Sequence, residues 1–375
     1  MPKILYVSNT ANFSKFNLPF MKWCKEQGWQ VDYCAPDDDD IEFCDKHIVL
    51  PIKRNPFHFS LCKCIYKLRQ ILEKNNYDII HCHTPVASVI ARLAARKLYK
   101  QGKVKIIYTA HGFHFYTGAS LINWLFYYPV EKYLSKYCDV LITINDEDYQ
   151  RALKKFKMKT LLKFNGIGVN PDVFYPNKDN SEKNQLRTNF GYSPEDFILI
   201  YCAEFIPRKN HQLLFEILPR LKQSIPELKV ILAGKGVLLN YYKNEAKKLG
   251  IDDVIRFTGY SGSMSDLDRI SNVMVFTSTQ EGLSLSIVEA LMTGLPVVAS
   301  KIRGNTDVIE DGKNGFLCSL NNSETFLKSI LKIYKQPELQ KELSSYALIS
   351  SKKFILDIPV FKMSEIYLDL IDYNS

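Results

Sequence analysis

Two glutamates, Glu281 and Glu289, are placed where their carboxylates could bind the hydroxyl groups of a sugar. A carboxylate is an acceptor of hydrogen bonds, and hydroxyl groups are donors. Glu289 lies among Ile287, Val288 and Ala290, where a carboxylate is costly unless it is paired or bound to a ligand. We expect Glu281 to hold a sugar and Glu289 a ribose diol. The alternative is a pair of solvated glutamates at the start of a helix.

The two glutamates depend on a strand, a loop and a helix for their positions. Residues 273–277 are β-branched and apolar, as in a buried parallel strand, and apolar residues at helical spacing follow from 285 to 292. A Gly-Leu-Pro sequence ends this helix before the next strand, 297–299. The N-terminus of such a helix favours an anion such as a diphosphate. The backbone amides expected to face it are those of Leu283, Ser284 and Leu285.

Composition indicates a globular protein of two domains. The chain has 375 residues, of which 46% are hydrophobic and 24% charged, and a net charge of +9. The basic residues are dispersed, which argues against nucleic acid and leaves anionic lipid or phosphate-rich substrates as partners. Nine cysteines without a CxxC pair favour a reducing cytoplasm. No apolar stretch reaches the roughly 20 residues of a spanning helix.

Candidate metal ligands are weak. Asp37–Asp40 is an acidic run of the kind that is usually solvated in a loop. Cys82 lies between His81 and His83, but a strand would point neighbours to opposite faces. We expect no bound metal.

The frame from Glu281 to Ser300 resembles the signature of the GT4 family of retaining glycosyltransferases. The resemblance covers nearly the whole chain and is strongest over 197–320. It implies an α/β protein of the GT-B fold, in which two Rossmann-like domains with parallel sheets face an interdomain cleft. The expected division is an N-terminal acceptor domain, 1–176, a polar linker, 177–196, a nucleotide-sugar-binding domain, 197–354, and a C-terminal helix crossing back, 355–375.

The resemblance also implies roles for single residues. The family clasps the donor diphosphate with an arginine and a lysine; Lys209 stands at the lysine position, but Glu204 occupies the arginine position, so Arg208 is expected to supply that charge. His111 follows a strand and is expected beside the reacting sugar. Further residues expected at the nucleotide are Gly234, Thr258 and Tyr260.

The implied activity is transfer of a sugar from a nucleotide sugar, most simply a UDP-sugar, with retention and without a tightly bound cofactor. The helix expected over 121–137 is aromatic and basic, so it is either core or a membrane-facing surface. With the positive charge, it suggests a polyprenyl-diphosphate-linked acceptor, as in bacterial capsule or exopolysaccharide synthesis. The expected enzyme is cytoplasmic and peripheral to the inner face of the membrane. The alternatives are a nucleotide-sugar 2-epimerase and a non-catalytic scaffold of the same fold.

Overall fold

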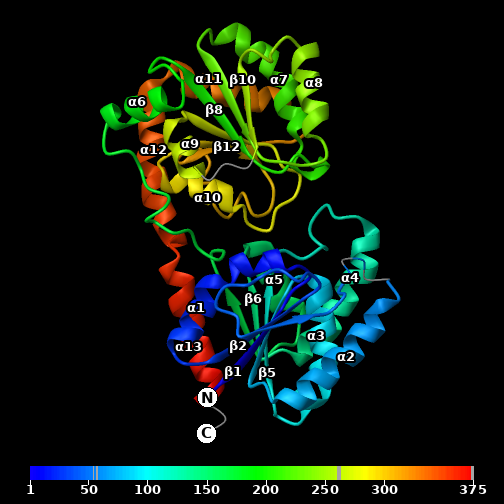
Figure 1. Cartoon of the computed structure of the whole chain (residues 1–375). Coiled ribbons are helices and arrows are strands. Elements are labelled where there is room, and N and C mark those ends of the chain that lie inside the picture. The colour runs from blue at the N-terminus through cyan, green and yellow to red at the C-terminus, as the bar shows by residue number, and fades with distance from the viewer. Residues whose placement is uncertain (54, 56–57, 260–262, 373–375) are drawn as a thin grey trace. The chain divides into compact units, whose positions relative to one another are not determined.

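The computed structural model describes residues 1–53, 55, 58–259 and 263–372. The chain divides into two compact units, Met1–Ile167 with Asp357–Ser375, and Gly168–Leu356. Each unit is built on a parallel sheet with helices packed on both of its faces (Figure 1). Among the described residues, no helix combines the length and the apolar character needed to cross a bilayer.

Unit 1, the first of these, has a seven-stranded sheet in the order β3-β2-β1-β4-β5-β6-β7. Its strands are β1 (Lys3–Val7), β2 (Gln30–Ala35), β3 (Lys46–Val49), β4 (Ile79–His83), β5 (Lys105–Ala110), β6 (Val140–Thr143) and β7 (Thr160–Lys163). Its helices are α1 (Leu18–Glu26), α2 (Ser60–Asn75), α3 (Pro85–Lys100), α4 (Leu121–Leu134), α5 (Asp146–Lys155) and α13 (Asp357–Asp372), with 3-10 turns η1 (Ala11–Phe16) and η2 (Ser135–Tyr137).

The apolar run of β1 serves two cores because alternate side chains of a strand point to opposite faces. Leu5 and Val7 join the core under α2 and α3, whereas Ile4 and Tyr6 join the core under α1 and α13. On the second face the Tyr6 hydroxyl lies 2.7 Å from that of Tyr367 of α13. The last helix is therefore part of the core of unit 1, where it lies beside α1 (Figure 1).

Unit 2, the remaining one, has a six-stranded sheet in the order β10-β9-β8-β11-β12-β13. Its strands are β8 (Phe197–Cys202), β9 (Leu228–Ala233), β10 (Ile255–Gly259), β11 (Val273–Phe276), β12 (Val297–Ser300) and β13 (Gly315–Cys318). Its helices are α6 (Asn180–Asn189), α7 (His211–Ser224), α8 (Leu239–Lys248), α9 (Met264–Ile270), α10 (Leu285–Met292), α11 (Ser323–Lys335) and α12 (Pro337–Ser351), with 3-10 turns η3 (Pro207–Lys209) and η4 (Lys352–Phe354).

The strand order reverses once in each sheet, between β1 and β4 in unit 1 and between β8 and β11 in unit 2. At such a point the loops leave the carboxyl ends of neighbouring strands in opposite directions, and open α/β sheets bind their ligands there. The topology therefore predicts ligand-binding sites at the loops after β1, β4, β8 and β11.

The polar segment 177–196, expected to be a linker, contains α6 instead. Asp179 caps this helix by accepting a hydrogen bond from the Glu182 amide at 2.9 Å. Arg187 is buried and donates to the carbonyls of Ile270 and Pro194. The polar composition conceals a helix because the buried side chain of α6 is a guanidinium, and only the partly buried Leu186 adds an apolar contact with the core.

The first two helical segments of unit 1 are η1 and then α1, which begins at Leu18 because a proline at position 19 suits the first turn of a helix. The helix expected over 121–137 ends as α4 at Leu134 and continues as a 3-10 turn; Pro129 lies inside α4.

Candidate functional site

The carboxylate of Glu281 is the centre of a charged cluster in unit 2. It is 8% exposed and lies 2.7 Å from the Lys209 ammonium and 3.4 Å from a guanidinium nitrogen of Arg208. The Ser278 hydroxyl donates to the same carboxylate at 2.6 Å. Two cations and a hydroxyl compensate the burial of this carboxylate, whose oxygens can accept further hydrogen bonds.

The cluster is assembled from the loops after β8 and β11, at the strand-order reversal of unit 2. The Tyr201 hydroxyl at the end of β8 donates to the Lys209 carbonyl, and the Thr277 hydroxyl donates to the Asn210 carbonyl at 2.7 Å. The amide of Thr279 donates to the Arg208 carbonyl at 2.9 Å. These bonds hold the backbone of η3 against the loop after β11. The backbone positions from which the Arg208 and Lys209 side chains extend are therefore fixed.

The loop between Glu281 and α10 leaves backbone donors available. Within the described part of the chain, the amides of Leu283, Ser284 and Leu285 donate to no protein acceptor. The loop is held from behind by Gly304, where a Cβ would lie 2.7 Å from the Gly282 carbonyl oxygen. Available amides at the first turn of a helix form a place for an anion.

Glu289 lies farther along α10 and interacts electrostatically with the Asp268 carboxyl and the Cys202 thiol. Burial raises the pKa of Glu289 from its ordinary 4.5 to about 7. Asp268 of α9 is 2% exposed, and burial together with the charge of Glu289 raises its pKa well above the usual range. The Cys202 thiol lies 3.9 Å from the Asp268 carboxyl. The arrangement makes Glu289 a carboxyl group that a bound donor of hydrogen bonds would help to ionise.

A pocket of about 300 Å³ borders this cluster and is lined by Arg208, Lys209, Gly234, Gly259 and Glu204, among others. Gly234 has a φ of +157°, and a Cβ there would lie 1.9 Å from the Ala203 carbonyl oxygen, so only glycine fits where β9 approaches β8. Gly234 thus lines the same pocket as the two cations. Thr258 is one residue from the pocket wall, and Tyr260 lies outside the described residues.

His111 belongs to unit 1, at the end of β5. Its Nε2 lies 3.2 Å from Nδ1 of His83, and the ring of Phe13 contacts it edge-on at 4.8 Å between centroids. Burial lowers the pKa of His111 to about 4, so the ring is neutral at physiological pH. His83 lies at the end of β4 and Phe13 in η1, so the loops at the strand-order reversal of unit 1 surround this histidine.

Several residues of the cluster were not foreseen. Ser278 carries no sequence signal beyond its place near a strand end. Asp268, in α9, has a sequence signal only as part of the Asp266–Asp268 pattern, a weak candidate for metal binding. Arg303, after β12, donates to the Glu281 carbonyl at 3.3 Å, and no motif marks it. The sequence suggests His83 only as a weak metal ligand. The signals for its contact with His111 are the alternation of side chains along β4 and the position of His111 directly after β5.

The titratable side chains do not gather in the manner of a metal centre. Among the described residues, no group of three or more His, Cys, Asp or Glu side chains is arranged to hold a metal ion. Whether catalysis needs a metal is a separate question, and the expectation of none stays a prediction.

Comparison with known proteins identifies the class of this two-unit protein as a glycosyltransferase. Residues 182–348 match the family model "Glycosyl transferases group 1", and residues 3–145 match "Glycosyl transferase 4-like". The chain is 39% identical over 376 residues to the Bacillus subtilis protein named "Putative glycosyltransferase EpsD", covering 100% of this chain and 98% of the relative.

Other relatives extend the comparison. The UDP-Gal:alpha-D-GlcNAc-diphosphoundecaprenol alpha-1,3-galactosyltransferase of Escherichia coli is 26% identical over 354 residues, 93% of this chain and 88% of the relative. The crystal structure of Anabaena HepE in complex with UDP-glucose has a TM-score of 0.79 at 18% identity, covering 98% of this chain and all of that one. The chain therefore belongs to the group 1, GT4-like family of glycosyltransferases, and the expected GT-B fold is confirmed.

Proposed function

We propose that this protein transfers a sugar from a UDP-sugar to a saccharide carried on polyprenyl diphosphate, with retention of the anomeric configuration, in the synthesis of a bacterial surface polysaccharide. The observation that carries the donor half is the buried Glu281 carboxylate with Lys209 and Arg208 beside it, next to the available amides before α10. The acceptor half is supported by the E. coli relative, whose name specifies a diphosphoundecaprenol acceptor.

In this proposal Lys209 and Arg208 bind the diphosphate and stabilise the charge of the leaving group, as an oxyanion hole does. Arg208 is 42% exposed at its side chain and can turn from Glu281 to the phosphates without unpacking the core. Glu281, still held by Ser278, accepts hydrogen bonds from the donor sugar, and Glu289 from the ribose.

Retention follows from a same-face displacement, in which the bond from the anomeric carbon to the phosphate oxygen breaks as the acceptor oxygen attacks. The leaving phosphate takes the acceptor's proton, so no protein nucleophile is assigned. The amides of Leu283, Ser284 and Leu285 assist the phosphate. Neutral His111 is proposed as a hydrogen-bonding partner of the sugar, since its pKa of about 4 prevents it from acting as a cation. No metal or nucleic acid takes part.

We propose that the protein acts at the cytoplasmic face of the membrane. The support is the outward face of α4, where Leu121 is 79% exposed and Leu125 70% exposed, together with a net charge of +9. Apolar side chains with a positive protein surface suit an anionic membrane, in which a polyprenyl-linked acceptor resides.

The first experiment is thermal unfolding of the protein with UDP-, GDP-, ADP- and dTDP-sugars. A ligand that binds the folded state alone raises the melting temperature, and at one hundred times its Kd it adds about 2.7 kcal/mol. UDP-sugars should stabilise the wild type, and Lys209→Ala should lose the effect. Lys222→Ala is the matched control, because Lys222 pairs with Asp253 on an exposed surface of the same unit.

The transfer itself is tested with UDP-galactose, UDP-glucose or UDP-N-acetylhexosamines and a short polyprenyl-diphosphate N-acetylglucosamine, with NMR of the product's anomeric proton. A product of inverted configuration would contradict retention. Free sugar released without an acceptor would favour the epimerase. If none of the nucleotide sugars stabilises the protein, the non-catalytic scaffold would be favoured.

A further inference from the structure

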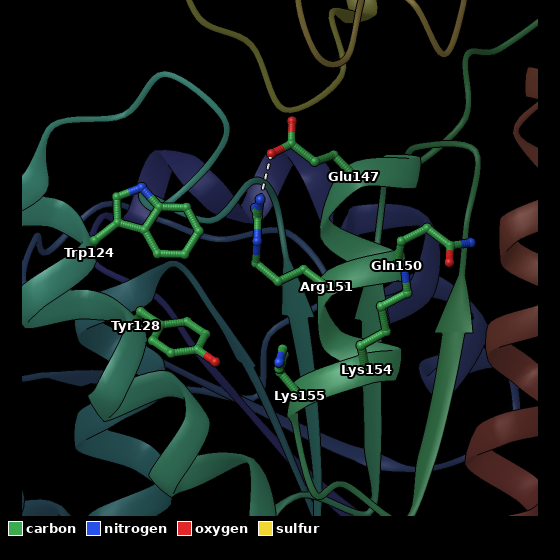
Figure 2. Close-up of a pocket in the computed structure, with 7 residues that line it drawn as sticks. All are labelled: Trp124, Tyr128, Glu147, Gln150, Arg151, Lys154 and Lys155. Carbon is green, nitrogen blue, oxygen red and sulfur yellow. Dashed lines mark hydrogen bonds and ion pairs between the residues drawn. The ribbon is translucent and has the colours of Figure 1, made fainter.

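A second pocket, in unit 1, combines aromatic rings with cations. It has a volume of about 340 Å³ and lies between α4, which contributes Trp124 and Tyr128, and α5. The residues from α5 are Glu147, Gln150, Arg151, Lys154 and Lys155. Figure 2 shows the two rings on one side of the pocket and the α5 side chains on the other. The volume lies within the range of about 300–1,000 Å³ that is usual for small-molecule sites.

Arg151 and Glu147 form contacts within the protein that give the pocket its shape. Arg151 donates to the Phe115 carbonyl and to Glu147, each at 2.8 Å, and its guanidinium lies 4.8 Å from the centroid of the Trp124 ring. Glu147 also accepts the backbone amide and hydroxyl of Thr117, at 2.7 and 2.9 Å. These contacts fix the ring of Trp124 and explain why the pKa of Glu147 is lowered despite partial burial.

The two lysines are not used in this way. Lys154 and Lys155 are exposed, and within the described ranges neither ammonium has an ion pair or a hydrogen bond to the protein. With Arg151 balanced by Glu147, the pocket keeps a surplus of two positive charges. Ammonium groups beside an aromatic wall suit a phosphate attached to a sugar, because the phosphate accepts charge-assisted hydrogen bonds and a pyranose packs its apolar face on a ring.

The same helix offers an apolar surface that begins at the edge of this pocket. Successive residues of a helix are turned by about 100°. Leu121, Ile122 and Leu125 are the most exposed apolar residues of α4, at 79%, 62% and 70%. They lie on the arc that starts beside Trp124 and Tyr128. At the far edge of that arc, Phe126 and Val130 line an apolar hollow of about 140 Å³ between α4 and α3.

We propose that the pocket between α4 and α5 binds the diphosphate-sugar head of the lipid-linked acceptor, with Lys154 and Lys155 at the diphosphate and Trp124 and Tyr128 at the sugar. The isoprenoid chain lies along the exposed apolar arc of α4. This inference rests on the proposed function for the identity of its ligand. The observations behind it are those of unit 1 alone, so it can be tested independently of the donor.

Farnesyl diphosphate is the probe, because it joins a diphosphate to an isoprenoid chain, and inorganic pyrophosphate is the probe without the chain. Binding is followed by tryptophan fluorescence with UDP at saturation, so that the diphosphate site of unit 2 is occupied. Farnesyl diphosphate should quench the wild type and bind at least about tenfold more tightly than pyrophosphate. Trp124→Phe should abolish the quench, which assigns the signal to this pocket.

Lys154→Ala with Lys155→Ala should weaken both probes at least about tenfold. Leu121→Ser with Leu125→Ser should weaken farnesyl diphosphate and leave pyrophosphate unchanged. The matched control is Lys97→Ala with Lys100→Ala in the last turn of α3, which should change neither. Stabilisation by UDP should persist in all of these variants, because their substitutions lie outside unit 2.

Equal affinity of the Lys154/Lys155 variant and the control for farnesyl diphosphate would overturn the proposal. So would binding of phosphatidylglycerol vesicles that needs the two lysines while farnesyl diphosphate shows no binding, because the pocket would then hold a phospholipid headgroup. If UDP does not raise the melting temperature of the wild type, by contrast, that result counts against the proposed function and leaves the probe measurements valid.

Discussion

The buried ion pair of Arg92 and Glu131 should be strongly coupled, and breaking it should loosen α4. Arg92 on α3 lies 2.7 Å from the Glu131 carboxylate on α4, and the two side chains are 1% and 4% exposed. The guanidinium also donates to Ser88 and lies 4.5 Å from the centroid of the Tyr108 ring. The Tyr108 hydroxyl donates to Glu131 at 3.3 Å. Replacing either member alone leaves the other charge buried without its counter-ion.

The expected loss of stability follows from the burial and pairing of these two charges. Arg92→Met or Glu131→Met should each cost about 3–5 kcal/mol, the range for breaking one side of a buried pair. For a unit of this size that corresponds to a fall of about 6–20 °C in melting temperature. The double variant removes both charges and leaves the Tyr108 hydroxyl without its acceptor, which costs about 1–3 kcal/mol. Ser88 loses the guanidinium as a donor, but its hydroxyl keeps its bond to the Pro85 carbonyl. It should therefore be more stable than either single variant.

Calorimetric melting of the wild type, the two single variants and the double variant completes the cycle. Lys25→Met is the control, because Lys25 lies 2.6 Å from Asp45 in the same unit but both side chains are about one-third exposed. That change should cost less than about 1 kcal/mol. A double variant whose loss equals the sum of the single losses would refute the reasoning, because the two charges would then be solvated independently of each other.

Four further predictions concern the candidate site and the two histidines of unit 1. Because burial raises the pKa of Glu289 from 4.5 to about 7, the unfolded chain loses this proton first, so stability falls as pH rises from about 4.5 to 7; Glu289→Gln should remove that fall in melts across this window. The pH dependence due to His111 has the opposite sign: its pKa is lowered from 6.5 to about 4, so stability is lost as pH falls between these values, and His111→Asn should reduce the loss. His83→Phe removes the 3.2 Å contact with His111 but no charge at neutral pH, because the pKa of His83 is lowered by burial. It should lower kcat without changing UDP affinity. Gly304→Ala places a Cβ 2.7 Å from a carbonyl oxygen at a φ of +84° and should weaken UDP binding by calorimetric titration, while Gly312→Ala, at a φ of +77° in open space, should only lower stability by about 1–2 kcal/mol.

Much of the fold could be predicted because its strands are continuous apolar runs. Strands buried on both faces, such as β8 and β11, need β-branched and apolar residues throughout, and glycine or proline ends the helices between them. The segment of α6 escaped prediction because a buried guanidinium, not an apolar stripe, holds it. Two of the partners of this guanidinium, Ile270 and Asn272, lie more than eighty residues away, so no local pattern reveals them.

Local spacing determined the motif from Glu281 to Glu289, with its loop amides and the start of α10, because a strand, a turn and a helix in succession leave few other geometries. The family followed from that frame, and the fold followed from the family. Which charges meet Glu281 was decided only by the tertiary structure. Lys209, Arg208 and Arg303 reach it from the ends of strands β8 and β12, and their approach depends on the order of strands in a sheet. Pairing of strands is a non-local choice, so the cluster exists only once the chain has folded.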